Sequence, residues 1–154
     1  MAYEQEKQIA IEAVRQAAKL CETVRVEMVP KAIEKQDKSP VTVADYGSQA
    51  IICRALAAAF PHDSVVGEED AATLSEPALV PVLASVTAQV NRVIAGATDN
   101  DVLSWIDYGN GQVAPRYWTL DPIDGTKGFL RGDQYAIALA LVVDGDLKVG
   151  VLGC

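Results

Sequence analysis

Residues Trp118–Gly132 read Trp-Thr-Leu-Asp-Pro-Ile-Asp-Gly-Thr-Lys-Gly-Phe-Leu-Arg-Gly, and the other motifs of the chain make sense around this stretch. Its first three residues have the pattern of a buried strand end, which delivers Asp121 to a fixed place. Pro122 restricts the backbone on both sides, so the chain can turn and bring Asp124 to face the same point. Two carboxylates so close to each other repel unless cations lie between them. Because Mg²⁺ prefers oxygen ligands of this kind, the stretch predicts a magnesium site.

The residues that follow the acidic pair predict a phosphate site beside the metal. Gly125 and Thr126 open a short predicted helix that runs through Phe129. The N-terminus of a helix presents backbone N–H groups to an anion. One stretch therefore provides for both a metal and a phosphate.

The overall composition indicates which kinds of molecule the chain is suited to bind. The chain has 154 residues, half of them hydrophobic, which is enough for one domain or for part of a larger one. With 13 basic and 21 acidic side chains its net charge is −8, which argues against nucleic-acid polymers and anionic membranes as partners. The longest apolar run, Ala136–Val143, is too short to span a bilayer, and the charged N-terminus lacks a secretory signal. We therefore expect a cytoplasmic protein that handles phosphates with metals.

The cysteines and the single histidine suggest no metal site of their own. Cys21, Cys53 and Cys154 lack the spacing of a disulfide framework or a zinc site, so we expect buried reduced thiols. His62 stands in a polar turn, where a surface position is the simpler interpretation.

Two helices are predicted in the first 60 residues. Apolar residues recur at helical spacing from Ala10 to Met28, which indicates a packing helix. The polar segment Glu34–Pro40 is expected to form an exposed loop, and a second helix is expected to begin at Thr42. Asp45 lies three residues after Thr42, so it is either the acidic member of a capping box or a site residue.

The middle of the chain predicts a short strand followed by two helices. Ser64–Gly67 reads as a strand, and the acids Glu68-Glu69-Asp70 that follow are either a solvated helix start or a source of a third metal carboxylate. Ser75 and Pro77 suit the start of a packing helix for which Gly96 would be the C-terminal cap. A further short helix, with Trp105 facing inward, is expected between Thr98 and Tyr108.

The last twenty residues predict a β-hairpin. The segment Tyr135–Val143 is almost continuously apolar, as in a buried strand. Asp144-Gly145-Asp146 is a turn sequence, and Leu147–Leu152 reads as the returning strand.

Taken together, the acidic motifs resemble those of a known family. Asp45, the segment Gly67–Asp70 and the segment Asp121–Thr126 occur in the order found in the inositol monophosphatase superfamily, which comprises Mg²⁺-dependent, lithium-sensitive phosphatases. The segments Lys38–Tyr46 and Lys127–Gly132 are most similar to its 3'(2'),5'-bisphosphate nucleotidase branch, which acts in sulfate assimilation.

The resemblance implies a mixed α+β fold in αβαβα layers, with the two N-terminal helices packed on a largely antiparallel sheet. It implies that residues 1–154 form the N-terminal α+β domain, because the relatives continue past Cys154 into a second half that supplies a further metal-binding aspartate. The chain is then expected to be an N-terminal portion of a longer enzyme or a truncated form.

The resemblance also implies roles for individual residues. Two or three Mg²⁺ ions are expected, with Li⁺ as an inhibitor. One ion would be held by Glu68, Asp121 and the backbone carbonyl of Ile123, and Asp121 would bridge to a second ion held by Asp124. The catalytic set would be Asp45, Glu68 and Thr126, in which Asp45 and the Thr126 hydroxyl orient the attacking water.

The substrate phosphate would meet the residues after the acidic pair. The resemblance implies that the backbone N–H groups of Gly125 and Thr126 bind it. Lys127 and Arg131 lie about one helical turn apart, so they either contact a substrate phosphate or form a solvated basic face.

The implied activity is removal of the 3'-phosphate from adenosine 3',5'-bisphosphate, with 3'-phosphoadenylyl sulfate as a further substrate. Two alternatives stay open. One is a phosphatase of inositol (poly)phosphates or sugar bisphosphates from the same superfamily, and the other is a truncated, non-catalytic module that binds metal or phosphate. The expected partner is a small phosphorylated nucleotide, and the sequence leaves the oligomeric state open.

Overall fold

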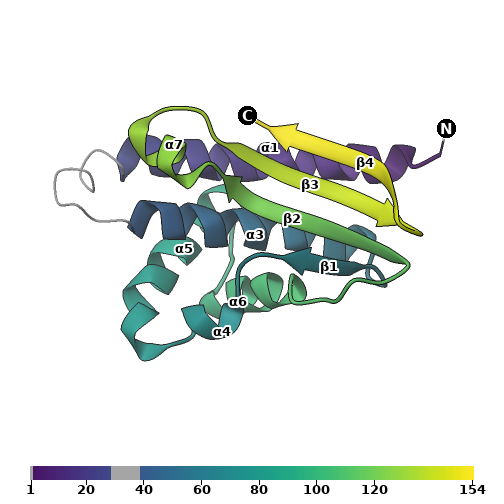
Figure 1. Cartoon of the computed structure of the whole chain (residues 1–154). Helices are drawn as coiled ribbons and strands as arrows, with labels where there is room; N and C mark the ends of the chain where they lie inside the picture. The colour runs from purple at the N-terminus through teal and green to yellow at the C-terminus, as the bar shows by residue number, and fades with distance from the viewer. Residues whose placement is uncertain (1, 29–38) are drawn as a thin grey trace.

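A computed structural model describes residues 2–28 and 39–154 of the chain. Its sheet has four strands in the order β1 (Ser64–Gly67), β2 (Arg116–Asp124), β3 (Ala136–Val143) and β4 (Asp146–Gly153). Strands β1 and β2 are parallel, whereas β2–β3 and β3–β4 are antiparallel. The prediction of a mixed α+β fold with a largely antiparallel sheet is therefore confirmed (Figure 1).

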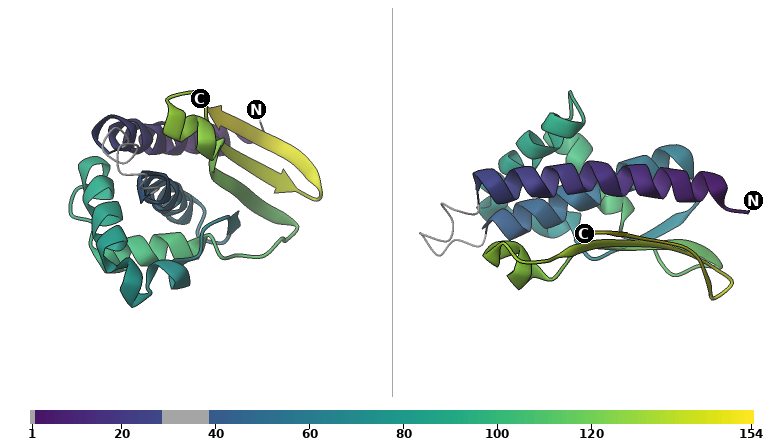
Figure 2. Two further views of the ribbon diagram at one scale, coloured as in Figure 1. Left: turned by 60° about the vertical axis from the view of Figure 1, so that its left-hand side comes forward. Right: turned by 90° about the horizontal axis from the view of Figure 1, so that it is seen from above.

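Helices α1 (Glu4–Glu27) and α3 (Ser39–Ala59) pack together on one face of this sheet (Figure 2). They approach closely where Gly47 of α3 meets Leu20 of α1, because a Cβ atom at Gly47 would lie 2.7 Å from a Leu20 methyl carbon. Helix α3 also contacts α5, α6 and β2, so it forms the centre of the core (Figure 2). This arrangement confirms the prediction that two N-terminal helices cover the sheet.

Helix α3 begins three residues earlier than predicted. The structure starts it at Ser39 and not at Thr42, so the end of the predicted loop at 39–40 is helical. Proline is favoured in the first turn of a helix, where its missing N–H costs no hydrogen bond. Pro40 therefore belongs to the first turn of this helix, whereas the sequence analysis placed it at the end of a loop. The remainder of that predicted loop, 34–38, lies outside the described residues.

Smaller helices surround α3 on the side away from the sheet, and one of them, α5, also contacts α1. They are α4 (Ala71–Leu74), the 3₁₀ turn η1 (Pro77–Leu79), α5 (Val80–Val93) and α6 (Asp99–Tyr108). Two predicted caps are wrong: Ser75 ends α4 through bonds to its preceding carbonyls, and the C-cap of α5 is Ile94, two residues before Gly96. Thr98 caps α6 through a capping box with Asp101, and Trp105 is half-buried.

The C-terminal hairpin forms as predicted. Asp144 and Gly145 both adopt positive φ angles of 52° and 80°, which suit a tight turn between twisted strands. Of the three cysteines, Cys21 and Cys53 are buried thiols as expected, but Cys154 is exposed because it follows the end of the edge strand β4. His62 is exposed, in agreement with its expected surface position.

Candidate metal and phosphate site

The parallel pairing of β1 with β2 brings the two acidic motifs together. Gly67 pairs with Leu120, so Glu68 and Asp121 follow paired residues on adjacent strands. Because parallel strands run in the same direction, the residues that follow a paired position lie next to each other, which places these two carboxylates side by side. Asp45 reaches the same region from α3, which packs against β2.

Mutual repulsion marks these side chains as one cluster. Burial raises the pKa of Asp45 to about 8, with further contributions from the charges of Glu69, Glu68 and Asp121. The pKa of Glu68 is raised by burial, then by the adjacent Asp121 and by Asp124. The pKa of Glu69 is raised by burial and by Glu68 and Asp121. Four carboxylates therefore share one partly desolvated space, in which burial and like charge disfavour the ionisation of Asp45, Glu68 and Glu69.

The cluster fits a cation in charge and donor type. Oxygen Oδ1 of Asp121 is buried and has no hydrogen-bond partner among the residues that the structure describes, although a buried carboxylate oxygen normally has one. A hard cation would satisfy this oxygen and remove the repulsion. Within the described ranges, no three His, Cys, Asp or Glu side chains already surround one point as metal ligands do. An ion would therefore have to draw the carboxylates closer together.

Asp45 is not a helix cap. Helix α3 begins at Ser39, so Asp45 lies in its second turn and not at the position that a capping box requires. Asp70 does act as a cap, because its Oδ1 accepts a hydrogen bond from the Ala72 N–H at 2.9 Å. Of the three consecutive acids, Glu68 and Glu69 join the cluster, and the helix-start interpretation applies to Asp70.

The segment after Asp121 remains in the sheet for longer than predicted. Strand β2 continues to Asp124, and its pairing with β3 shifts by one residue between Asp121 and Asp124. Such a bulge bends the strand and redirects side chains. Ile123 is buried, whereas Asp124 is exposed. The negative charge of Asp124 still raises the pKa of Glu68, so Asp124 lies at the margin of the cluster.

Helix α7 (Thr126–Arg131) begins directly after this bulge, as predicted. Gly125 precedes it with a φ of 91°, a conformation that favours glycine. Thr126, Lys127 and Arg131 are all exposed. The structure thus places the predicted phosphate residues at an accessible helix start beside Asp124.

The chain matches the model of the inositol monophosphatase family over residues 2–154. It belongs to the inositol monophosphatase family. Among relatives of this family, it is 44% identical over 166 residues to a 3'(2'),5'-bisphosphate nucleotidase of Emericella nidulans. This alignment covers 100% of this chain and 47% of that protein. A 3'(2'),5'-bisphosphate nucleotidase 1 of Arabidopsis thaliana is 44% identical over 167 residues, with coverages of 100% and 47%. The chain spans about half the length of these curated relatives.

Solved structures of the inositol monophosphatase family share the fold. An inositol monophosphatase from Anabaena superposes with a TM-score of 0.59 at 19% identity, over 99% of this chain and 40% of that one. CysQ from Bacteroides thetaiotaomicron gives a TM-score of 0.51 at 19% identity, over 98% and 42%. No helix in the described part of the chain is both long and apolar enough to cross a membrane.

The sequence analysis missed a contact between α1 and α7. Arg25 donates hydrogen bonds to the carbonyls of Gly128, at 3.5 Å, and Asp133. Its guanidinium carbon lies 5.8 Å and 5.1 Å from the ring centroids of Phe129 and Tyr135. Helix α1 was expected to serve only for packing, but it also fixes the segment that follows the acidic pair. A cation near the end of an otherwise apolar helix face was the available signal.

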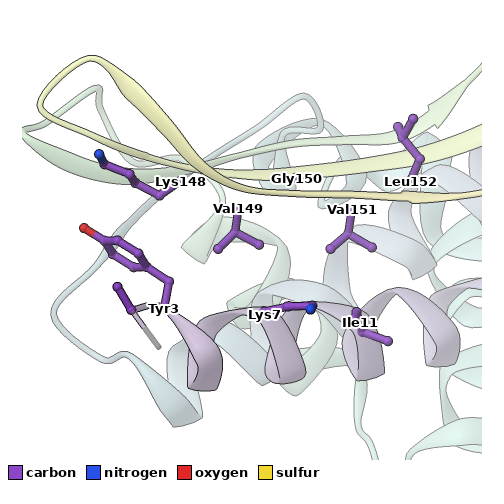
Figure 3. Close-up of a pocket in the computed structure, with 9 residues that line it drawn as sticks. Tyr3, Lys7, Ile11, Lys148, Val149, Gly150, Val151 and Leu152 are labelled. Atoms are coloured by element: carbon purple, nitrogen blue, oxygen red, sulfur yellow. The ribbon is translucent and has the colours of Figure 1, made fainter.

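The largest of the hollows, of about 800 Å³ beside Arg25 and Tyr135, does not reach the acidic cluster, and two smaller ones do not enclose it. One, of about 410 Å³, lies between the start of α1 and β4, where Tyr3, Lys7 and Lys148 surround apolar side chains (Figure 3). It contains no carboxylate. Another of about 410 Å³ opens on the sheet beside Thr119 and Asp121. The cluster is therefore an open, charged surface and not a closed apolar pocket.

Proposed function

We propose that this chain carries the metal- and phosphate-binding face of a Mg²⁺-dependent phosphatase that hydrolyses the 3'-phosphate of adenosine 3',5'-bisphosphate. The observation that carries this proposal is the convergence of Asp45, Glu68, Glu69 and Asp121 on one repelling cluster. A cluster of this kind costs folding free energy unless cations compensate for it. Phosphoryl transfer needs mainly positioning and neutralisation of charge, so it requires no nucleophilic side chain.

The proposed ligands follow from the arrangement of donors. Glu68, Asp121 and the Ile123 carbonyl would hold one Mg²⁺, and Asp121 with Asp124 would hold a second. When bound, such ions activate water at neutral pH and stabilise charge on attacking and leaving oxygens. Oxygen Oδ1 of Asp121 supports this assignment because it is buried and accepts no hydrogen bond from residues 2–28 or 39–154.

The other site residues would orient water and substrate. Asp45, partly buried beside Glu68 and Glu69, would accept a hydrogen bond from the attacking water, together with the Thr126 hydroxyl. The backbone N–H groups of Gly125 and Thr126 would bind the phosphate at the start of α7. Lys127 and Arg131 are exposed on that helix and would attract the anionic substrate.

The substrate proposal rests on the names of the relatives and on the segment Lys127–Gly132. Relatives 44% identical to the chain are named 3'(2'),5'-bisphosphate nucleotidases. 3'-Phosphoadenylyl sulfate, which carries the same 3'-phosphate, would be a further substrate, and Li⁺ would inhibit. The free thiols Cys21 and Cys53 support a reducing, cytoplasmic location.

Phosphate release provides the direct test. Adenosine 3',5'-bisphosphate, inositol 1-phosphate and a sugar bisphosphate are compared with Mg²⁺ present, and Li⁺ is then added. We expect the nucleotide to be the best substrate and Li⁺ to inhibit its hydrolysis. Equal or faster turnover of the inositol ester contradicts the nucleotide assignment. Asp124→Asn is expected to abolish phosphate release while leaving the circular dichroism spectrum unchanged.

A second candidate is a module that binds Mg²⁺ or phosphate without turnover. It is favoured by the lack of three side chains already grouped as ligands in the described part of the chain. Titration calorimetry with Mg²⁺ and with inorganic phosphate separates the two candidates. Heat of binding without any phosphate release from the three esters supports the module.

A further inference from the structure

The amide of Gln49 is a buried polar group with well-formed hydrogen bonds. Its Nε2 donates to the carbonyls of Glu69 at 2.9 Å and Ile106 at 3.0 Å, and its Oε1 accepts from the Glu69 N–H at 2.9 Å. The residue is fully buried, at 0% exposure. One side chain therefore joins α3, the acidic segment after β1 and the end of α6.

Two glycines make room for this side chain. A Cβ atom at Gly67 would lie 2.6 Å from Oε1 of Gln49, and one at Gly109 would lie 2.6 Å from its Nε2. Neither glycine has a positive φ, so they are needed for space and not for backbone freedom. The Gly67 N–H also donates to the Gly109 carbonyl at 2.7 Å, so a hydrogen bond joins the two glycines that contact the Gln49 amide.

The hydrogen bonds of Gln49 fix the backbone that carries the acids. Both the N–H and the C=O of Glu69 bind the same amide, as they would bind a neighbouring strand. The peptide between Glu68 and Glu69 is thereby held in one orientation, although these residues lie outside any strand or helix. Gln49 also follows Asp45 by one turn of α3, so one helix sets the positions of all three acids.

We infer that Gln49 is a positioning residue for the candidate metal site: its amide holds the Glu68–Glu69 segment beside Asp45 and Asp121 against their mutual repulsion. This inference rests on the proposed function, because it assigns a purpose to the geometry of the acidic segment. Groups that orient metal ligands typically change metal affinity by about 10-fold to 100-fold when they are removed.

The test compares the buried amide of Gln49 with a half-buried amide in the same chain. Gln49→Met keeps the approximate length of the side chain and removes all three hydrogen bonds. The control is Asn91→Leu, because Asn91 forms a similar amide network with Thr87, Ala97 and Gly96 at 3.0, 2.6 and 2.8 Å, which joins α5 to the loop before α6. Unfolding by urea and Mg²⁺ affinity by calorimetry are measured for both variants and for the wild-type chain.

We expect both variants to lose stability and only Gln49→Met to lose Mg²⁺ affinity, by about tenfold or more. Unchanged affinity in folded Gln49→Met, or an equal loss in Asn91→Leu, overturns the inference. A wild-type chain that binds no Mg²⁺ overturns the proposed function and this inference with it. Failure of the inference alone differs from this, because the wild-type chain then still binds Mg²⁺.

A second pair of measurements covers the case in which Gln49→Met does not fold. Gly67→Ala keeps the Gln49 amide but pushes against its Oε1, so we expect a smaller loss of Mg²⁺ affinity in the same direction. In the wild-type chain, the Glu69 amide proton is expected to exchange slowly with solvent. Rapid exchange at Glu69, or wild-type Mg²⁺ affinity in Gly67→Ala, contradicts the assigned role.

Discussion

Trp118 donates its indole N–H to Oδ2 of Asp63 over 3.0 Å, which ties the beginning of β2 to the residue just before β1. The same carboxylate accepts two hydrogen bonds from Nε of Arg116, at 2.8 and 3.0 Å. Trp118 is fully buried and stacks on Phe60 with ring centroids 5.7 Å apart. Because the register of β1 against β2 places Glu68 beside Asp121, these bonds stabilise the geometry of the acidic site from the opposite end of the strands.

The first prediction concerns this anchor. Asp63→Ala leaves the buried indole N–H and Nε of Arg116 without their acceptor, although Glu6 still binds the other two guanidinium nitrogens at 3.2 Å. We therefore expect a loss of about 2 kcal/mol in the free energy of unfolding. Urea denaturation measures it. Asp107→Ala, at an exposed position on α6, is the control and should change stability by less than about 0.5 kcal/mol. Equal effects of the two substitutions contradict the assignment.

Local patterns in the sequence were sufficient to predict most of the helices and strands. The apolar repeat of α1 has a helical period, and the hairpin has a continuous apolar strand followed by a turn sequence. The start of α3 was wrong because Ser39-Pro40 is compatible both with a loop end and with a first helical turn. Only the packing of α3 against α1 and the sheet decides between these states.

The acidic site was predictable in its members but not in its geometry. The acids belong to short motifs that can be recognised in the sequence, whereas the pairing of Gly67 with Leu120 joins residues far apart in sequence. Gln49 was missed because its hydrogen bonds reach the backbone of distant segments. The available signal was a polar residue on the buried face of α3, one turn from both Asp45 and Cys53.

The second prediction concerns charge repulsion in the absence of metal. Asp121→Asn removes one negative charge from the cluster and gives the buried position a group that can donate, so the metal-free variant should unfold at a higher temperature than the wild-type chain. Mg²⁺ should stabilise the wild-type chain, by about 2.7 kcal/mol at 100 times its dissociation constant, but not the variant.

Differential scanning calorimetry with chelator and then with Mg²⁺ checks both parts of this second prediction. Asp107→Asn, which removes an equal charge from an exposed position on α6, serves as the control and should respond to Mg²⁺ as the wild-type chain does. A lower melting temperature for metal-free Asp121→Asn would show that the cluster does not repel.

The third prediction is a dependence of stability on alkaline pH. Tyr135 donates a hydrogen bond to Glu22 at 2.6 Å, and its pKa is raised by burial, by this bond and by the charges of Cys21 and Glu22, while Arg25 lowers it. Above its unfolded pKa of about 10, the unfolded chain releases this proton while the folded chain retains it. The folded chain then binds more protons, so its stability is fully present below about pH 10 and falls as the pH rises further.

Urea unfolding between neutral pH and about pH 11 measures this dependence. Tyr135→Phe should cost about 1 kcal/mol near neutrality and should show a shallower decline above about pH 10. Glu22→Gln, which keeps an acceptor but removes its charge, should fall between the two. Parallel pH curves for the wild-type chain and Tyr135→Phe would contradict the prediction.

The fourth prediction concerns the close approach of α7 to the segment that leads into β3. A Cβ atom at Gly128 would overlap the carbonyl oxygen of Gln134, which belongs to the backbone and cannot rotate away. Gly128→Ala should therefore displace α7 and cost about 1–3 kcal/mol of stability. Gly150→Ala is the control, because its nearest neighbour would be a Leu147 methyl carbon at 3.9 Å, and it should be nearly neutral. Equal stabilities of the two variants would contradict this explanation of the glycine.

The fifth prediction concerns the edge of the sheet at β4. In the described part of the chain, β4 pairs only with β3, and it exposes Leu147 and Leu152 at 68% and 69%. An open edge with apolar side chains is a template for pairing with another copy, so we expect concentration-dependent association of the chain in solution.

Light scattering coupled to size-exclusion chromatography measures this association. Leu152→Lys should reduce association, because a charged side chain on an edge strand opposes pairing, whereas Val113→Lys, at a 71% exposed position outside the strands, should not. A monodisperse wild-type monomer at all concentrations, or equal effects of the two lysines, would show that this edge is not the associating surface.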